Sequence, residues 1–176
     1  MSKRVPFKLR KPLYLQNDEV SIEAGVLMKA KPQEELIVPE GVIGLTRASL
    51  VNTKKLITPT TFIALPVSAF MGLALEEIDL SKSTKLERIP QMTFGMTNNL
   101  RKVILPEGLK SIEDRAFSAA KALKEIHIPN SVKHIAPSAF AVSSIDKITS
   151  HQPEELKKLM SDSGVPRHFV DAVIGV

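Results

Sequence analysis

The stretch LRKVILPEGLKSIEDRAFSAAKA (residues 100–122) is followed directly by LKEIHIPNSVKHIAPSAF (residues 123–140). The two stretches align without a gap, so that every matching position recurs after 23 residues. The matched pairs are Leu100 with Leu123, Val103 with Ile126, Leu105 with Ile128, Pro106 with Pro129, Leu109 with Val132, Ile112 with Ile135 and Phe117 with Phe140. A self-match at a fixed period of about 20–50 residues is typical of a repeat protein.

The same pattern extends in both directions along the chain. Phe70 and Phe94 hold the aromatic position of two earlier copies, and Leu50 replaces phenylalanine in the first clear copy. A further half-copy follows Phe140. We therefore expect about five repeats over residues 35–149.

Each copy contains a segment close to Leu-x-x-Ile-x-Ile-Pro, whose alternation sends its last two apolar side chains to one face of a short strand. Proline ends the strand because it has no N–H to extend the backbone ladder. The later Ala-Phe pair sends one large ring inward. A single copy has too little apolar surface to fold alone, so we expect stacked copies with neighbouring parallel strands and a buried phenylalanine column.

Residues 128–132 (IPNSV) and 139–140 (AF) match, almost letter for letter, the pattern L-x-x-I-x-I-P-x-S-V-x-x-I-x-x-x-A-F-x-x-C-x-x-L. The chain thus resembles the BspA-type, or Treponema pallidum-type, leucine-rich repeat. It departs from that pattern where Thr97, Ala120 and Ser143 replace cysteine. The resemblance implies a mainly β, right-handed solenoid with short parallel strands that is used for protein binding, and many such relatives are surface or secreted proteins.

The two ends of a solenoid expose sheet edges and need caps. We expect a basic arm and a β-rich cap or degenerate repeat over residues 1–34, with extended pieces near residues 5–9, 13–15 and 20–22. Residues 150–176 break the repeat and predict a helical cap. A helix-start signal lies at residues 151–155, where a proline precedes two glutamates.

Ser163-Gly164 predicts the end of this helix, and a second short helix is expected over residues 166–173. Phe169, Val170 and Val173 would face inward. A C-terminal cap is the first interpretation, and an amphipathic helix for a partner or a membrane surface is the second.

The net charge of +5 comes entirely from the N-terminal segment. Removing five basic residues from the total of 24 leaves 19, which equals the 19 acidic residues. The five are Lys3, Arg4, Lys8, Arg10 and Lys11. Such an arm can bind nucleic acid or another acidic surface, which is the alternative function, or it is a solvated terminus.

No motif for catalysis stands out. The chain has no cysteine, its four histidines form no i, i+4 pair, and no Gly-x-Ser-x-Gly, P-loop or dinucleotide motif is present. We therefore predict a protein that is not an enzyme and uses no cofactor or metal. The sequence gives no indication of its oligomeric state.

No apolar run reaches the length of about 18 residues that a membrane span needs. Charges interrupt the N-terminal residues, which therefore lack the apolar core of a secretory signal peptide. A cytoplasmic location is expected, with secretion by a signal-less route or delivery into a host cell as the other option.

Two columns of strand residues are expected to face the concave side of the solenoid. The first alternates in charge at every step and reads Glu35, Lys55, Glu77, Lys102, Glu125 and Lys147. Neighbouring members would pair across parallel strands. These pairs either form a weakly stabilising ion-pair ladder or provide a charged rim for a partner.

The second column reads Ile37, Ile57, Asp79, Ile104, His127 and Thr149. Exposed isoleucines beside charges indicate an interaction surface, unless isoleucine only suits a strand there or a terminal segment covers it. The predicted function is a protein–protein interaction module, as a bacterial effector or a cytosolic scaffold. Its predicted partner-binding residues are Ile37, Ile57, Asp79, Ile104, His127, Lys55, Glu77, Lys102 and Glu125.

Overall fold

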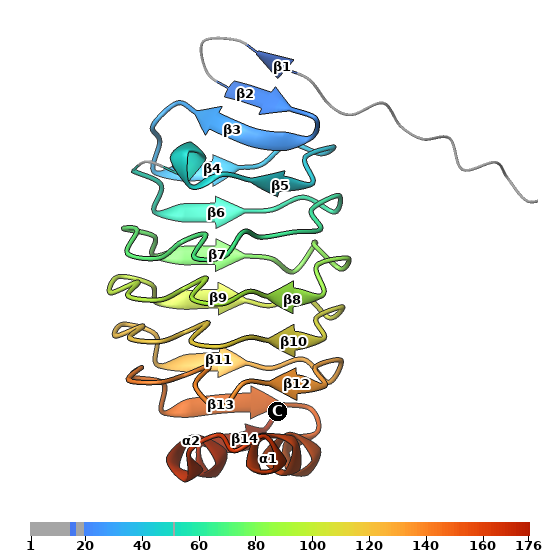
Figure 1. Cartoon of the computed structure of the whole chain (residues 1–176), viewed down its shortest axis with the longest axis vertical. Coiled ribbons are helices and arrows are strands. Elements are labelled where there is room, and N and C mark those ends of the chain that lie inside the picture. The colour runs from blue at the N-terminus through green and yellow to red at the C-terminus, as the bar shows by residue number, and fades with distance from the viewer. Residues whose placement is uncertain (1–14, 17–19, 51) are drawn as a thin grey trace, which may run out of the picture.

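The computed structural model describes residues 15–16, 20–50 and 52–176. Successive coils of the chain are stacked along the long axis of the molecule, one coil for each repeat (Figure 1). Most coils contain a three-residue strand, a turn, and a second short extended segment. The predicted solenoid with short parallel strands is confirmed.

The first strands of the coils lie side by side and form the larger face. Its strands are β4 (Glu35–Ile37), β6 (Lys55–Ile57), β7 (Glu77–Asp79), β9 (Lys102–Ile104), β11 (Glu125–His127) and β13 (Lys147–Ser150). The first four form one parallel sheet, and β11 and β13 belong to another. We call the outer side of these six strands the strand face. The central residue of every strand points inward and is buried.

The return path of the coils forms a second, narrower parallel sheet from β8 (Arg88–Ile89), β10 (Ser111–Ile112) and β12 (His134–Ile135). The equivalent residues of the first repeat form β5 (Gly44–Leu45), which is followed by the 3-10 helix η1 (Arg47–Leu50). β5 pairs with a strand of the N-terminal segment instead.

That N-terminal segment contains β1 (Leu15–Gln16), β2 (Val20–Glu23) and β3 (Val26–Ala30). β1 pairs antiparallel with β2, β2 pairs antiparallel with β3, and β3 then joins β5 in parallel. These strands lie in the segment for which a β-rich cap was expected. The basic arm and the extended piece expected near residues 5–9 lie outside the described residues.

At the other end, the chain leaves β13 and forms α1 (Pro153–Asp162), α2 (Arg167–Asp171) and β14 (Val173–Gly175). α1 begins at the predicted proline and ends at the predicted Ser163-Gly164. The prediction that Val173 belongs to a second helix is wrong. Val173 lies in β14, opposite Ile148 in parallel register, because it fills the buried position that the repeats give to leucine, isoleucine or valine.

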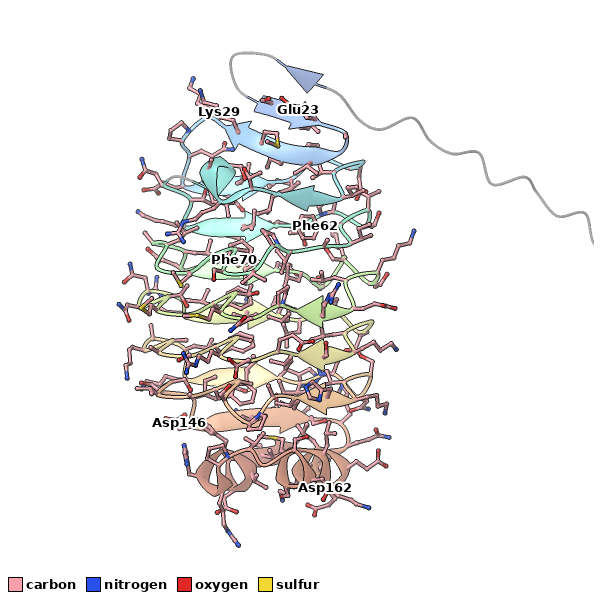
Figure 2. All side chains as sticks on the ribbon, viewed as in Figure 1. Glu23, Lys29, Phe62, Phe70, Asp146 and Asp162 are labelled. Atoms are coloured by element: carbon pink, nitrogen blue, oxygen red, sulfur yellow. The ribbon has the colours of Figure 1, made fainter. Side chains whose placement is uncertain are left out.

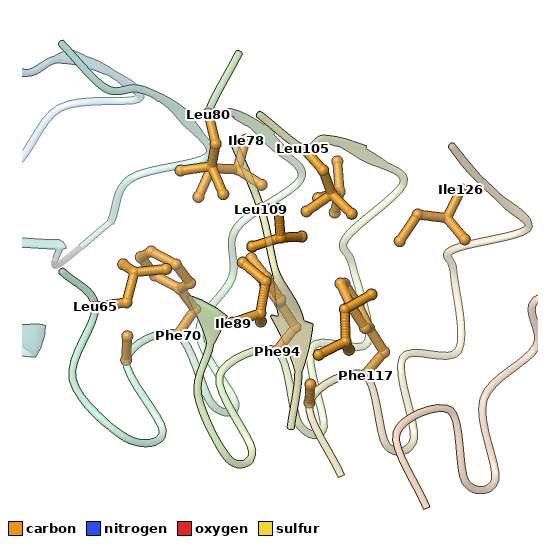
Figure 3. Packing of buried hydrophobic residues seen from close by; sticks show 14 of the residues in the cluster. Leu65, Phe70, Ile78, Leu80, Ile89, Phe94, Leu105, Leu109, Phe117 and Ile126 are labelled. Atoms are coloured by element: carbon orange, nitrogen blue, oxygen red, sulfur yellow. The ribbon is translucent and has the colours of Figure 1, made fainter. Parts of the chain in front are cut away.

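The buried apolar side chains form one cluster along the stack. The predicted phenylalanine column is its axis, and Figure 3 shows Phe70, Phe94 and Phe117 in a row inside the coils. Ring centroids lie 5.1 Å apart between Phe70 and Phe94, 5.0 Å between Phe94 and Phe117, and 5.8 Å between Phe117 and Phe140. Phe169 of α2 extends the column, and its ring centroid lies 5.6 Å from that of Phe140. Figure 2 shows Phe70 inside the coils.

The turn around each stacked phenylalanine has a recurrent left-handed backbone. The residue two positions after the ring has φ between 56° and 65° in four successive turns, in Gly72, Met96, Ala119 and Val142. Only one of the four is glycine. The position therefore accepts side chains despite a cost of roughly 1–2 kcal/mol for a residue with a Cβ.

The third repeat has a longer turn, because six positions separate Leu80 from Leu86 whereas four separate Leu105 from Leu109. The longer turn presses against the next coil at Gly108. A Cβ at Gly108 would lie 1.8 Å from the carbonyl oxygen of Thr84. The glycine is therefore required by the neighbouring backbone.

We expect Phe117→Ala to lower the free energy of unfolding by about 3–5 kcal/mol, because the change removes a fully buried ring from the middle of the column. Urea or guanidinium melts measure the loss. Val142→Ala, at a side chain that is 70% exposed, is the control and should change stability by less than about 0.5 kcal/mol. A loss below about 1 kcal/mol for Phe117→Ala would contradict the role of the ring.

We expect Gly108→Ala to cost about 1–3 kcal/mol, because its methyl group would force the Thr84 backbone to move. Ser131→Ala is the matched control, since Ser131 holds the equivalent position in the next repeat and its buried hydroxyl has no hydrogen-bond partner among the described residues. In denaturant melts, Gly108→Ala should unfold at a clearly lower denaturant concentration than Ser131→Ala. Equal stabilities would show that the longer turn can yield without cost.

Candidate protein-interaction surface

The charge column lies on the strand face in the expected register, from Glu35 on β4 to Lys147 on β13. Its members pair less often than expected. Lys55 Nζ lies 2.9 Å from Glu35 Oε1, and Lys147 Nζ lies 2.9 Å from Glu125 Oε1. The prediction of pairing is wrong for Glu77 and Lys102, which form no ion pair within 4.0 Å among the described residues.

A second charged column, which the sequence analysis missed, precedes the first by one residue. Lys54 Nζ lies 2.6 Å from Glu34 Oε1, and Arg101 pairs with Glu76. The hydrogen bond and the charge of Glu34 raise the pKa of Lys54. The same alternation of charge between repeats would have revealed this column, because the residues recur at the repeat spacing.

The isoleucine column is graded in its exposure. Ile37 is 66% exposed, whereas Ile57 and Ile104 are half-buried. Asp79 is also half-buried, and its carboxylate accepts a hydrogen bond of 2.8 Å from the N–H of Ser81. The apolar side chains of the strand face are thus most exposed at β4 and only partly exposed on β6 and β9.

The expectation that Thr149 faces solvent in this column is wrong, because Thr149 is only 3% exposed. β14 pairs with β13 and brings Ile174 opposite Thr149. The ring of His127 contacts the Thr149 hydroxyl, with 3.1 Å between Nδ1 and Oγ1. The C-terminal strand therefore closes this end of the column.

Eight of the nine predicted partner-binding residues line two adjacent shallow clefts on the strand face. Lys55, Ile57, Glu77 and Asp79 line the first, Glu125 and His127 line the second, and Lys102 and Ile104 line both. Ile37 lies beside them on β4. The strands bring the residues together, and their part in binding stays a prediction.

Two histidines meet at the C-terminal end of the strand face, 24 residues apart in the sequence. The ring centroids of His127 and His151 are 5.1 Å apart in an edge-on arrangement. Burial lowers the pKa of His127, and the neighbouring His151 lowers it further, against the opposing charge of Glu107. Sequence spacing could not reveal this pair, because His151 lies outside the repeat.

A further cleft, of mixed apolar and charged lining, lies at the second sheet and was not predicted from the sequence. Exposed Ile63 and Val67 of the second repeat form one wall, and Arg88 and Asp114 are among the residues of the other. No backbone hydrogen bond of the described residues joins segment 63–65 to β8. Pro90 follows β8 and has no N–H, whereas the equivalent amides of Glu113 and Ala136 donate to the preceding coil, which explains part of this gap.

Comparison with known families decides the identity of the repeat. The model of the BspA-type leucine-rich repeat region matches residues 20–162 in six copies, where the sequence analysis counted about five. The chain belongs to the BspA-type leucine-rich-repeat family. This match covers most of the chain and includes both clefts of the strand face.

Solved bacterial leucine-rich-repeat proteins share this BspA-type fold. A leucine-rich cell surface protein of Faecalibacterium prausnitzii superposes with a TM-score of 0.65 at 25% identity, over 74% of this chain and 37% of that protein. The Treponema pallidum leucine-rich-repeat protein superposes with a TM-score of 0.63 at 20% identity, and the match covers 84% of this chain and 71% of that protein. A Bacteroides ovatus leucine-rich-repeat protein superposes with a TM-score of 0.60 at 23% identity, and the match covers 85% of this chain and 42% of that protein.

The BspA-type chain thus spans well under half of the F. prausnitzii and B. ovatus proteins. No curated protein matches the chain. Within residues 15–16, 20–50 and 52–176, no helix has the length and apolar character needed to cross a bilayer.

We expect the BspA-type chain to lose stability as the pH falls below about 6.5, in part through His127. Since folding lowers the pKa of His127, the unfolded chain binds more protons in this range, and the folded state is disfavoured. Urea midpoints at about pH 7.5 and about pH 5.5 measure the decline. It should be smaller for His127→Gln than for the wild type.

The matched control for this measurement is His134→Gln, at an exposed histidine on β12. Carboxylates titrate alike in all three proteins, so they cancel in the comparison. An equal decline for His127→Gln and the wild type would show that His127 does not couple protonation to folding.

Proposed function

We propose that this chain is a non-enzymatic interaction module that binds a protein partner on its strand face. Leucine-rich repeats of this family serve in general in protein interaction. The observation that carries the proposal is the joint presence, on two adjoining clefts of the strand face, of half-buried isoleucines and of charges that form no ion pair among the described residues.

The strand face has the chemistry of a recognition surface rather than of a reaction site. Ile57 and Ile104 supply apolar area at the centre of the clefts, and Glu77 and Lys102 supply charges of opposite sign. Apolar residues surrounded by charges are typical of protein interfaces, where the apolar part contributes affinity and the charges select the partner.

The regular spacing of the coils favours an extended partner. Parallel strands repeat at about 4.8 Å, so equivalent side chains form rows along the molecule. A segment lying along these rows would contact several repeats at once. We also propose a cytoplasmic location, with a role as a cytosolic scaffold or as a bacterial effector.

Replacing Ile57 and Ile104 with glutamate tests the proposal by affinity capture from a native lysate. Each change puts a charge into the apolar part of a cleft, and we expect the captured partner to bind at least about tenfold more weakly, or about 1.4 kcal/mol. Ile37→Glu extends the test to a residue that is 66% exposed, where the fold tolerates a charge.

Val67→Glu is the control, because Val67 is 63% exposed but lies at the cleft of the second sheet. Thermal melts of all variants separate lost binding from lost folding. Full retention of the partner by folded Ile37→Glu, Ile57→Glu and Ile104→Glu would exclude the strand face as the binding site.

A further inference from the structure

The backbone ladder of the strand face is interrupted between β9 and β11. Between the other neighbouring repeats, amides of one coil donate to carbonyls of the next, as from Lys55 to Glu34, from Leu80 to Ile104 and from Ile128 to Thr149. Within the described residues, no backbone hydrogen bond joins β9 to β11.

The interruption leaves particular backbone groups open. The amides of Leu105, Lys124 and Glu125 make no bond across the ladder, although their counterparts in other repeats do. Val103 and Leu105 are each 6% exposed, whereas Ile78 and Leu80 in the preceding coil are 1% and 0% exposed. The seam between the coils is therefore accessible from the strand face, where it forms the second cleft.

Positive charge gathers at the beginning of these two strands. The second charged column alternates from Glu34 to Arg101, but Lys124 then follows Arg101 with the same sign. Like charges directly opposite each other on neighbouring strands disfavour pairing, in agreement with the open ladder at this step. Arg101 pairs with Glu76, but Lys124 forms no ion pair within 4.0 Å among the described residues.

Lys102, at the same end of the cleft, also has no ion-pair partner within that distance in the described part of the chain. The carboxylate of Glu125 is engaged by Lys147 at 2.9 Å. Lys102 thus lines the second cleft together with Ile104, and Lys124 stands at the start of the neighbouring strand β11. This arrangement is complementary to a carboxylate followed by an apolar group.

We propose that the seam between β9 and β11 binds an acidic, extended protein segment, with a carboxylate at Lys102 and Lys124 and an apolar side chain on Ile104. The inference rests on the proposed function and names the chemistry of its partner. The segment lies across the strand face over the seam, because β9 and β11 remain neighbouring strands and leave no room for a third strand between them. Basic segments are rejected, because the two lysines repel them.

A short fluorescent peptide with alternating glutamate and leucine, blocked at both ends, is the probe. Fluorescence anisotropy measures its binding to the full chain, and the same peptide with glutamine in place of glutamate is the comparison. We expect the glutamate peptide to bind at least about tenfold more tightly. Lys102→Glu and Lys124→Glu should each weaken binding of the glutamate peptide about tenfold.

Lys110→Glu is the matched control, since it makes the same charge change at an exposed residue beside β10 of the second sheet. Equal losses for Lys110→Glu and Lys124→Glu would reduce the effect to net charge and overturn the proposal. Amide shifts of the 15N-labelled chain should map the peptide to Leu105, Lys124 and Glu125. Shifts confined to another surface, or no binding up to about 1 mM, would also overturn it.

These outcomes are separable from the proposed function. A partner whose capture depends on Ile57 and Ile104 but not on Lys102 or Lys124 would support binding on the strand face and reject an acidic segment at the seam. Loss of the partner in both sets of variants, with Lys110→Glu unaffected, would support both.

Discussion

Contact between phenylalanine rings of successive coils is the constraint on which the remaining structure depends. Four successive coils contribute one ring each, and neighbouring rings from Phe70 to Phe140 have centroids between 5.0 and 5.8 Å apart. This spacing is close to the distance of about 4.8 Å between neighbouring strands, so the aromatic column and the sheets keep the same period. A coil without its neighbours would expose the ring, and the fold is therefore stabilised between repeats rather than within them.

The periodic part of the molecule could be predicted from the sequence because it depends only on spacing. Buried residues such as Val103, Ile126 and Phe117 occupy the positions that the 23-residue period assigns to them. The order of charges on the strand face follows from the same period. The features that escaped prediction depend on contacts outside the repeat: Val173 completes a sheet from beyond α2, and His151 meets His127 after the last coil.

Local departures from regularity explain where the surface is open. The second sheet is interrupted at Pro90, which has no amide hydrogen to donate to the preceding coil, and the strand face is interrupted where Arg101 and Lys124 have the same charge. The aromatic column continues past both places and holds the coils together. The fold therefore tolerates two breaks in its backbone ladders without dividing its interior. No periodic argument from the sequence locates such seams, since the apolar pattern is unchanged there.

The left-handed turns beside the phenylalanines have a consequence for the evolution of this chain. At Met96, Ala119 and Val142 the conformation of the backbone is conserved while the side chain differs in size, and Met96 and Val142 extend into solvent. The outer edge of every coil thus accepts substitution with little effect on the interior. Paralogues could diverge along this margin, and gain or lose contacts there, while the repeat frame stays the same.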